Sequence, residues 1–129
     1  MGEVLDASAI VAFLLAEPGQ DIVADSIAAG AQVCAANLAE VMTVLVRGGM
    51  PAAAAGQVIA ELPVGCVELD LDLAVRAGAM VVHTRPFGLS LGDRVCLALA
   101  AREGCPVLTG DRDWVRVGPL VGVSVRVIR

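Results

Sequence analysis

The 129-residue sequence contains no lysine, and all nine of its basic residues are arginines. A P-loop needs a lysine on the nucleotide phosphates and Schiff-base chemistry needs a primary amine, so both classes of enzyme are excluded. The chain has one histidine, His83, and four cysteines with no Cys-x-x-Cys pair. We therefore expect no zinc site of Cys and His ligands, no catalytic role for His83, and reduced cysteines that pack as small apolar side chains.

Aromatic residues and long apolar runs are also scarce. The only aromatic residues are Phe13, Phe87 and Trp114, too few to form the stacking platforms of many proteins that bind single-stranded nucleic acids. Apolar residues make up 57% of the sequence, yet charged residues interrupt every stretch that approaches the roughly 20 residues of a membrane-spanning helix. The first residues also lack the basic segment of a signal peptide. We expect a cytoplasmic protein with no membrane segment.

The apolar pattern predicts strands that alternate with helices. Strands are expected at Glu3–Asp6, Gln32–Ala35, Cys66–Leu69, Val107–Thr109 and Val123–Val127. Helices are expected at Ala7–Ala16, Gln20–Ala29, Asn37–Arg47, Pro51–Leu62, from Asp70 or Asp72 to Val82, and Ser90–Glu103, with a turn or short helix at Asp111–Val117. This alternation predicts an α/β fold with a mainly parallel sheet of four or five strands, and the length suits one domain over residues 1–129.

Acidic residues stand where a sheet of this kind holds its ligands. Ligands bind beyond the carboxyl ends of the strands, and Asp6 and Asp111 follow two of the predicted strands. Glu40 and Asp93 are each expected in the first turn of an apolar helix that packs on the sheet. Buried charges need partners, and several carboxylates crowded together repel one another and take up protons unless a cation balances them. A divalent cation is the expected partner, and oxygen ligands suit Mg²⁺ or Mn²⁺.

Each acid also has a purely structural explanation. Asp6 and Asp111 have positions from which an acid can cap a helix or a turn. The pairs Asn37 with Glu40 and Ser90 with Asp93 have the spacing of a capping box, in which the acid reaches back to its own helix start. Any one acid alone indicates no more than a cap. Because the four acids all follow strands or lie at the starts of helices that pack on the sheet, their combination favours a single site that contains all of them.

Taken together, these segments resemble the PIN-domain family, above all the VapC-type nuclease toxins of type II toxin–antitoxin pairs. The resemblance covers essentially the whole chain. It rests on D-x-S after the first predicted strand, a glutamate near residue 40, S-L-G-D-R at 90–94 and L-T-G-D-R-D-W at 108–114. It implies a three-layer α/β/α fold. It also implies metal-binding catalytic acids and neighbouring hydroxyls, which fall on Asp6, Glu40, Asp93, Asp111, Ser8 and Thr109, with Asp113 as an additional acid that competes with Asp111 for the fourth position.

The activity that this resemblance implies is Mg²⁺- or Mn²⁺-dependent hydrolysis of RNA phosphodiesters. One ion, held by Asp6 with Glu40 and Asp93, would activate water, and a second ion at Asp111 would stabilise the departing oxygen. The basic residues Arg94, Arg112 and Arg116 are candidates for phosphate contacts, although each is equally well explained as a solvated surface residue. The resemblance further implies a homodimer and a cognate antitoxin that covers the cleft.

Two other interpretations remain open at this point. Haloacid-dehalogenase-like phosphatases also place an aspartate after the first strand, but they need a second aspartate where this chain has Ser8, and usually a lysine. The non-enzymatic alternative is a catalytically silent PIN fold that serves as an interaction module, and the presence of all four acids argues against it. Asp70 and Asp72 superficially resemble the site acids and are interpreted as helix caps.

Overall fold

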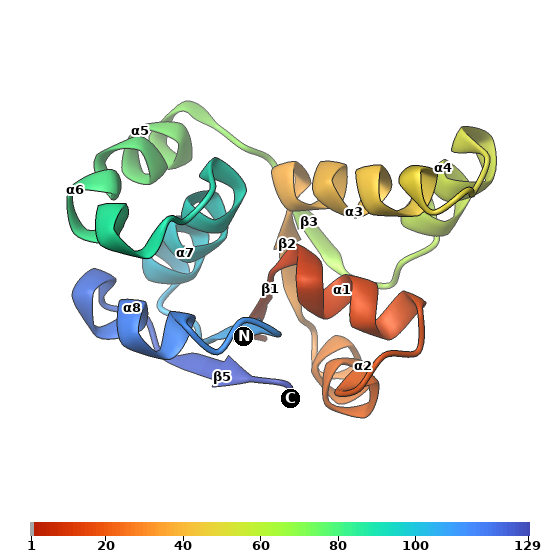
Figure 1. Cartoon of the computed structure of the whole chain (residues 1–129), viewed down its shortest axis with the longest axis horizontal. Helices are drawn as coiled ribbons and strands as arrows, with labels where there is room; N and C mark the ends of the chain where they lie inside the picture. The colour runs from red at the N-terminus through yellow and green to blue at the C-terminus, as the bar shows by residue number, and fades with distance from the viewer. Residues whose placement is uncertain (1) are drawn as a thin grey trace.

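A five-stranded parallel sheet lies between two layers of helices in the computed structural model, which describes residues 2–129 (Figure 1). The strands are β1 (Val4–Leu5), β2 (Gln32–Cys34), β3 (Gly65–Val67), β4 (Val107–Thr109) and β5 (Val125–Val127). Their order across the sheet is β3-β2-β1-β4-β5, and every neighbouring pair is parallel. The predicted three-layer α/β/α fold with a parallel sheet is confirmed.

The helices divide between the two faces in chain order. One face carries α1 (Ala7–Leu14), α2 (Gln20–Ala28), α3 (Ala35–Arg47) and α4 (Ala52–Ala60). The other carries α5 (Leu71–Ala79), α6 (Val81–Thr84), the 3-10 turn η1 (Arg85–Phe87), α7 (Leu91–Glu103) and α8 (Trp114–Val121). Figure 1 shows the two groups on opposite sides of the strands. The first half of the helical sequence thus covers one face and the second half covers the other.

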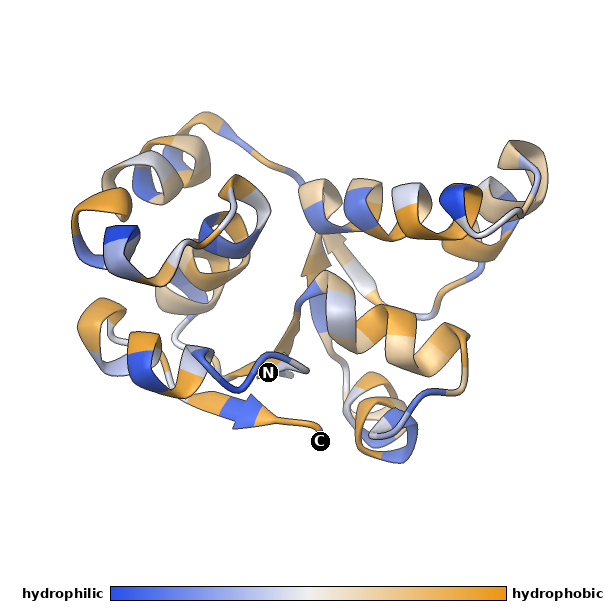
Figure 2. Cartoon of the chain, in the orientation of Figure 1, coloured by the Kyte–Doolittle hydropathy of each residue, from blue (hydrophilic) through white to orange (hydrophobic). Residues whose placement is uncertain are grey.

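Consecutive strand residues pack in two separate hydrophobic cores, one on each face of the sheet. Val4 packs in the core beneath α5, α7 and α8, whereas the next residue, Leu5, packs in the core beneath α1–α4. Val107 and Leu108 of β4 divide in the same way, and all four side chains are fully buried. A parallel sheet covered on both faces needs apolar residues at every position. The strands are accordingly mostly apolar in Figure 2.

The structure confirms the predicted strands and most helices but shifts several boundaries. The third helix begins at Ala35 rather than Asn37. The helix predicted to run to Val82 is divided, with α5 ending at Ala79. The last helix is longer than expected and continues through Pro119 to Val121. Local propensity sets these ends weakly, because tertiary packing overrides it.

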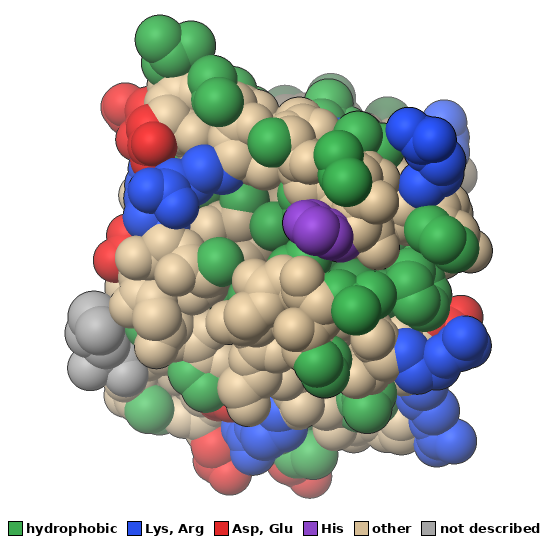
Figure 3. Space-filling view, turned by 90° about the vertical axis from the view of Figure 1, so that its left-hand side faces the viewer, with side chains coloured by type: hydrophobic (Ala, Val, Ile, Leu, Met, Phe, Trp, Pro, Cys, Tyr) green, Lys and Arg blue, Asp and Glu red, His purple; other side chains and the backbone are tan. Residues whose placement is uncertain are grey.

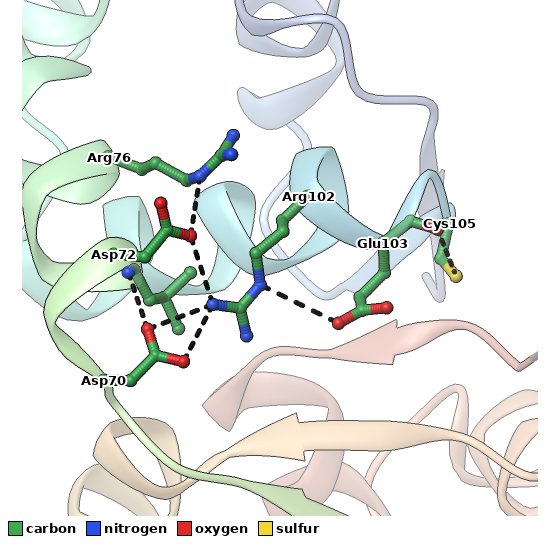
Figure 4. Close-up of polar contacts among 7 residues, drawn as sticks. Asp70, Asp72, Arg76, Arg102, Glu103 and Cys105 are labelled. Atoms are coloured by element: carbon green, nitrogen blue, oxygen red, sulfur yellow. Dashed lines mark hydrogen bonds and ion pairs between the residues drawn. The ribbon is translucent and has the colours of Figure 1, made fainter.

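Asp70 and Asp72 have structural roles: the predicted helix cap is confirmed for Asp70 and wrong for Asp72, which lies inside α5 and forms ion pairs instead. Asp70 caps α5, because its Oδ1 accepts a hydrogen bond of 2.8 Å from the Leu73 amide. Arg102 of α7 donates from Nη1 to both Asp70 carboxylate oxygens at 3.0 Å and also faces Asp72 at 3.4 Å (Figure 4). Asp72 in turn pairs with Arg76 at 2.9 Å. The group joins the start of α5 to the end of α7.

The cysteines are unpaired in the described part of the chain. Cys34, Cys96 and Cys105 are buried among apolar residues as expected, whereas the expectation of a packed thiol is wrong for Cys66, which is exposed on β3. Burial raises the pKa of the Cys96 thiol well above its usual range. Within residues 2–129, no helix combines the length and apolar character needed to cross a membrane.

Candidate active site

Asp6 stands at the point where the chain order of the sheet reverses. The chain leaves the central strand β1 to build β2 and β3 on one side, and later returns to place β4 and β5 on the other. Such a switch point is the usual ligand crevice of an open α/β sheet. Asp6 directly follows β1 and caps α1, where its Oδ1 accepts a hydrogen bond of 2.8 Å from the Ala9 amide. The cap explanation is therefore correct, and it fixes the carboxylate at the crevice.

Two hydroxyl groups hold the Asp6 carboxylate from either side. The Ser8 Oγ donates to Asp6 Oδ1 at 2.7 Å and accepts from the Gly110 amide at 2.9 Å. The Thr109 Oγ1 donates to Asp6 Oδ2 at 2.5 Å and accepts from the Asp111 amide at 3.0 Å. The two hydroxyls thus tie Asp6 to the loop after β4, and this loop carries Asp111. Ser8 and Thr109 lie where the sequence placed them, beside the acids.

The Asp6 carboxyl group is buried and forms no ion pair within residues 2–129. It is 5% exposed, and burial raises its pKa to about 6. The three hydrogen bonds from Thr109, Ser8 and Ala9 lower the pKa and only partly offset the desolvation, while the negative charge of Asp93 raises it further. A carboxylate offers about four lone-pair positions, and these bonds use three of them. One position stays open for a cation.

Glu40 is held by Asn37, a neighbour on its own helix, and Asn37 is also bonded to the start of α7. The Asn37 amide donates from Nδ2 to Glu40 Oε1 at 2.8 Å and to the Gly92 carbonyl at 3.0 Å. The expected capping box of Asn37 with Glu40 is wrong, because α3 begins two residues earlier with Cys34 at its N-cap. Glu40 accordingly lies in the second turn of the helix instead of the first.

Gly92 makes room for the Glu40 carboxylate. A Cβ atom on Gly92 would meet the Glu40 carboxylate carbon at 2.5 Å and Oε2 at 2.6 Å, much closer than non-bonded atoms approach. Asn37, which links the two, is 1% exposed, and its Oδ1 is buried without a hydrogen-bond partner within residues 2–129. An unpaired buried acceptor costs about 1–3 kcal/mol. Stability is therefore lost at the residue that orients Glu40.

Asp93 is both a helix cap and a member of the site. The Ser90 Oγ accepts from the Asp93 amide at 3.1 Å, and Asp93 Oδ2 accepts from the Ser90 amide at 3.0 Å, so the predicted capping box is confirmed. Burial raises the pKa of Asp93, and the charge of Asp111 adds to the effect. A cap does not preclude a second role, because only one of the two Asp93 carboxylate oxygens is used.

All four predicted acids line a single pocket of about 370 Å³. The other lining residues are Ala7, Ser8, Val11, Glu17, Val44, Trp114 and Arg129. The acids come from β1–α1, α3, α7 and the loop after β4, which are far apart in the sequence. The four acids that the sequence singled out therefore lie together at one pocket. Their catalytic role stays a prediction.

Asp113 and the arginines proposed for phosphate contacts do not line this pocket. Asp113 is at the start of α8, outside the pocket, with its amide donating to Asp111 Oδ1 at 3.0 Å. None of the three arginines proposed for phosphate contacts lines the pocket. Arg94 donates to the Ala77 carbonyl at 2.9 Å, Arg112 donates to the Arg129 carbonyl at 2.9 Å, and Arg116 lies 5.3 Å from the centre of the Phe87 ring.

Sequence reasoning missed Arg129, the pocket's arginine, together with Glu17. A usable signal was present for Arg129. It follows β5, which is parallel to β4 with Val127 beside Thr109, so it emerges at the same edge of the sheet as Asp111. The rule that identified the acids would also have identified this arginine. Glu17 follows the end of α1, and no comparable sequence pattern marks it.

The donor set of the pocket suits a hydrated Mg²⁺ or Mn²⁺ ion. No three Asp, Glu, His or Cys side chains among residues 2–129 converge closely enough to hold one ion together. Mg²⁺ usually takes only one or two protein carboxylates and keeps several waters, so a three-acid cage is not required. The open lone pair of Asp6 and the raised pKa values of Asp6 and Asp93 both indicate negative charge that lacks a cation. The residues fit such an ion.

Comparisons with known proteins agree with this geometry. A sequence profile of the PIN domain matches residues 4–119. VapC20 of Mycobacterium tuberculosis, described as a toxin that cleaves the sarcin-ricin loop, has a similar fold, with a TM-score of 0.75 at 19% identity over 91% of this chain and 95% of that one. DNA-bound VapBC of Salmonella typhimurium gives a TM-score of 0.76 at 15% identity over 100% of both chains.

A further similar structure is VapBC2 of Rickettsia felis, which was solved with a fragment of its promoter DNA. Its TM-score is 0.73 at 11% identity, over 98% of each chain. A comparison with curated proteins finds no match. At these identities, the structural matches establish a shared fold.

Proposed function

Because the chain belongs to the PIN-domain family, we propose that it is an endoribonuclease that depends on Mg²⁺ or Mn²⁺ and hydrolyses RNA phosphodiesters. The observation that carries the proposal is the convergence of Asp6, Glu40, Asp93 and Asp111 on one pocket at the switch point of the sheet. We further propose that the protein is the toxin of a type II toxin–antitoxin pair, because the similar structures described above come from such systems.

In this proposal Asp6, Glu40 and Asp93 would hold one hydrated divalent ion, with only one or two of them in direct contact and the rest acting through water, and Asp111 would hold a second. When bound, such ions supply Lewis acidity and activated water for phosphodiester hydrolysis. The protein's contribution is to keep its ligands oriented before the substrate arrives. Ser8 and Thr109 fix both oxygens of Asp6. The carboxylates act as ligands, so no side-chain nucleophile is required.

Asn37 and the Asp93 cap have the same orienting effect on the other two ligands. Asn37 directs one Glu40 oxygen, which leaves Oε2 free. The capping box uses Asp93 Oδ2 and leaves Oδ1 free. Val11, Val44 and Trp114 line the same pocket and exclude water from part of its wall. Interactions among buried charges are stronger in such surroundings than in bulk water.

A homodimer and an antitoxin are the partners that we propose. One similar structure is a toxin–antitoxin complex from Klebsiella pneumoniae, with a TM-score of 0.71. The protein has apolar surface available for such contacts. Figure 3 shows apolar side chains gathered around His83 on the face formed by α5, α6 and α8. The large exposed apolar residues of these helices include Leu71, Val75, Val81, Val82, Val115 and Leu120. We expect the complex to act in the cytoplasm.

The experiment that tests the nuclease proposal compares purified wild-type protein with Asp6→Asn and Asp93→Asn on single-stranded and structured RNA. Wild type is expected to cleave with Mg²⁺ or Mn²⁺ and to stop when EDTA is added. Both variants are expected to lose cleavage and keep the circular dichroism spectrum of the wild type. Asp25→Asn is the matched control, because Asp25 is an exposed acid of α2 outside the pocket. Cleavage at the wild-type rate by the two pocket variants would contradict the mechanism.

Two further measurements separate the nuclease from a silent scaffold and test the toxin role. Calorimetric titration with Mn²⁺ is expected to show binding to wild type and weaker binding to Asp6→Asn. If the wild type neither binds metal nor cleaves RNA, the result favours the silent scaffold. Expression is expected to arrest bacterial growth, and coexpression of a small DNA-binding protein encoded beside this gene is expected to restore it. Arrest that persists in Asp6→Asn would contradict a nuclease toxin.

A further inference from the structure

The acidic pocket contains one cationic side chain, that of Arg129. Five carboxylates line the pocket, namely the four proposed ligands and Glu17, and Arg129 is the only arginine among the lining residues within the described part of the chain. An RNA phosphate that approaches this surface meets repulsion wherever a metal ion does not neutralise it. The position of the single guanidinium group therefore matters for substrate binding.

One end of the guanidinium group is held by the protein. The Arg129 Nη1 donates to the Pro18 carbonyl at 3.2 Å and lies 3.6 Å from Glu17 Oε1. The backbone is held as well, because the Arg129 carbonyl accepts a hydrogen bond of 2.9 Å from Arg112 Nε. These contacts fix the direction of a long side chain before any ligand binds. A positioned arginine loses less conformational entropy on binding than a free one.

The other end of the guanidinium group has free donors within residues 2–129 and belongs to a residue that lines the pocket. Arg129 carries five N–H donors, and Nη2 and Nε have no hydrogen-bond partner within residues 2–129. A Cβ placed on Gly110 would lie 2.9 Å from Arg129 Nη2 and 3.3 Å from Ser8 Oγ. A side chain at position 110 would therefore crowd both the guanidinium group and the hydroxyl that is bonded to Asp6.

We propose that Arg129 binds the two non-bridging oxygens of one phosphate of the RNA backbone next to the carboxylate ligands. The proposal rests on the proposed function and identifies the group that holds the anionic substrate at that site. Two neighbouring N–H groups of a guanidinium match two oxygens of one phosphate, and such paired, charge-assisted hydrogen bonds are strong. Carboxylates that line a pocket cannot make this contact. The contact involves no base, so it positions RNA without reading sequence.

The test measures RNA binding in the Asp93→Asn background, where the substrate is expected to stay intact. Fluorescence anisotropy of a labelled single-stranded RNA of mixed sequence is recorded with Mg²⁺ over a range of salt concentrations. Adding Arg129→Gln is expected to weaken binding about 10-fold, as for loss of one charge-assisted hydrogen bond. The slope of log affinity against log salt is expected to fall by about 0.7, the value for one phosphate of a single strand.

Arg126→Gln is the matched control and Arg129→Lys is the second variant. Arg126 is an exposed arginine of β5 that pairs with Glu3 at 3.0 Å and does not line the pocket. Its loss is expected to leave the affinity within about twofold of the parent. Arg129→Lys keeps the charge and is expected to restore the salt slope but only part of the affinity. Calorimetry with Mn²⁺ is expected to give the same metal affinity for Arg129→Gln as for its parent.

Several results would overturn the role of Arg129. An unchanged affinity and salt slope in Arg129→Gln would do so, as would an equal loss in Arg126→Gln, which would indicate general attraction only. A loss of metal affinity in both Arg129 variants would show that the residue supports the fold of the site instead. Failure of wild type to cleave any RNA would overturn the proposed function, whereas the binding measurements would still decide the role of Arg129. If the parent binds no RNA, both proposals fail.

Discussion

Two groups of acidic side chains in this molecule differ in what balances their charge. On the surface of α5, arginine side chains pair with Asp70 and Asp72, and the Leu73 amide together with Arg102 lowers the pKa of Asp70 (Figure 4). In the pocket, burial raises the pKa values of Asp6 and Asp93, and each acid experiences the charge of another.

The difference separates acids that serve the fold from acids available to a ligand. A carboxylate whose charge is already balanced gains little from a metal ion. A buried carboxylate without a cation gains a great deal, because the ion removes both the desolvation cost and the mutual repulsion. In the sequence both groups look alike, since each contains aspartates at helix starts. The surroundings distinguish them.

The largest expected effect is on the stability of the metal-free protein. Asp6 has a pKa of about 6 when folded against 3.8 for a free aspartate, so the folded state binds more protons between these two values. In EDTA, the contribution of Asp6 to the free energy of unfolding is therefore expected to be highest below pH 4. This contribution is expected to fall by about 3 kcal/mol as the pH rises through 6. Urea unfolding at a series of pH values measures the decrease.

Asp6→Asn sharpens this prediction. The variant has no charge to bury at position 6. In EDTA its free energy of unfolding is therefore expected not to show this decrease with pH, and the variant is expected to be more stable than wild type at pH 8. Addition of Mn²⁺ at pH 8 is expected to stabilise the wild type and to leave Asp6→Asn nearly unchanged. A wild type whose stability rises steadily from pH 4 to pH 8 in EDTA would show that Asp6 is already balanced, like Asp70.

The next largest expected effect is a loss of RNA cleavage when the Glu40 carboxylate is displaced. Gly92→Ala places a methyl group where the Glu40 carboxylate lies, and the flexible end of that side chain is expected to move aside. The helix itself tolerates alanine better than glycine, so the melting temperature is expected to stay the same or rise. Cleavage of RNA is expected to fall about 10-fold or more, because a misplaced ligand no longer completes the site. Kinetics at saturating Mn²⁺ measure the loss.

Gly78→Ala is the matched control for this substitution. Gly78 also lies in a helix, and a Cβ there would have no contact within 4 Å. This variant is expected to keep full cleavage. Equal activity of Gly92→Ala and Gly78→Ala would mean that Glu40 does not need its observed position.

The smallest effect is expected at the surface group. Asp70→Asn removes the pairing with Arg102 and keeps an oxygen able to cap α5, and asparagine is as good a cap as aspartate. Since exposed ion pairs contribute little, a slightly lower melting temperature and unchanged cleavage are expected. Differential scanning calorimetry and the RNA assay measure the two quantities. A loss of cleavage comparable to that of Asp93→Asn would remove the distinction between the two groups of acids.

Much of this organisation was readable from local pattern. Short segments rich in apolar residues, placed between helical stretches, marked the strands, and an acid directly after β1 and another after β4 marked the ligand edge of a parallel sheet. The Ser90 with Asp93 capping box was correct, since both of its hydrogen bonds are local. The box expected at Asn37 was wrong, because the amide of Asn37 bonds instead to Gly92, 55 residues away, and α3 starts earlier.

The sequence by itself determined the order of the elements, the two-sided burial of the strands and the identity of the acids, because apolar periodicity and strand ends are properties of a few neighbouring residues. Only the tertiary structure decided which charges meet. Arg94 turns to a carbonyl of α5, while Arg129 enters the pocket beside Gly110. The electrostatic partner of a long side chain is set by distances across the fold, and these distances have no local pattern in the chain.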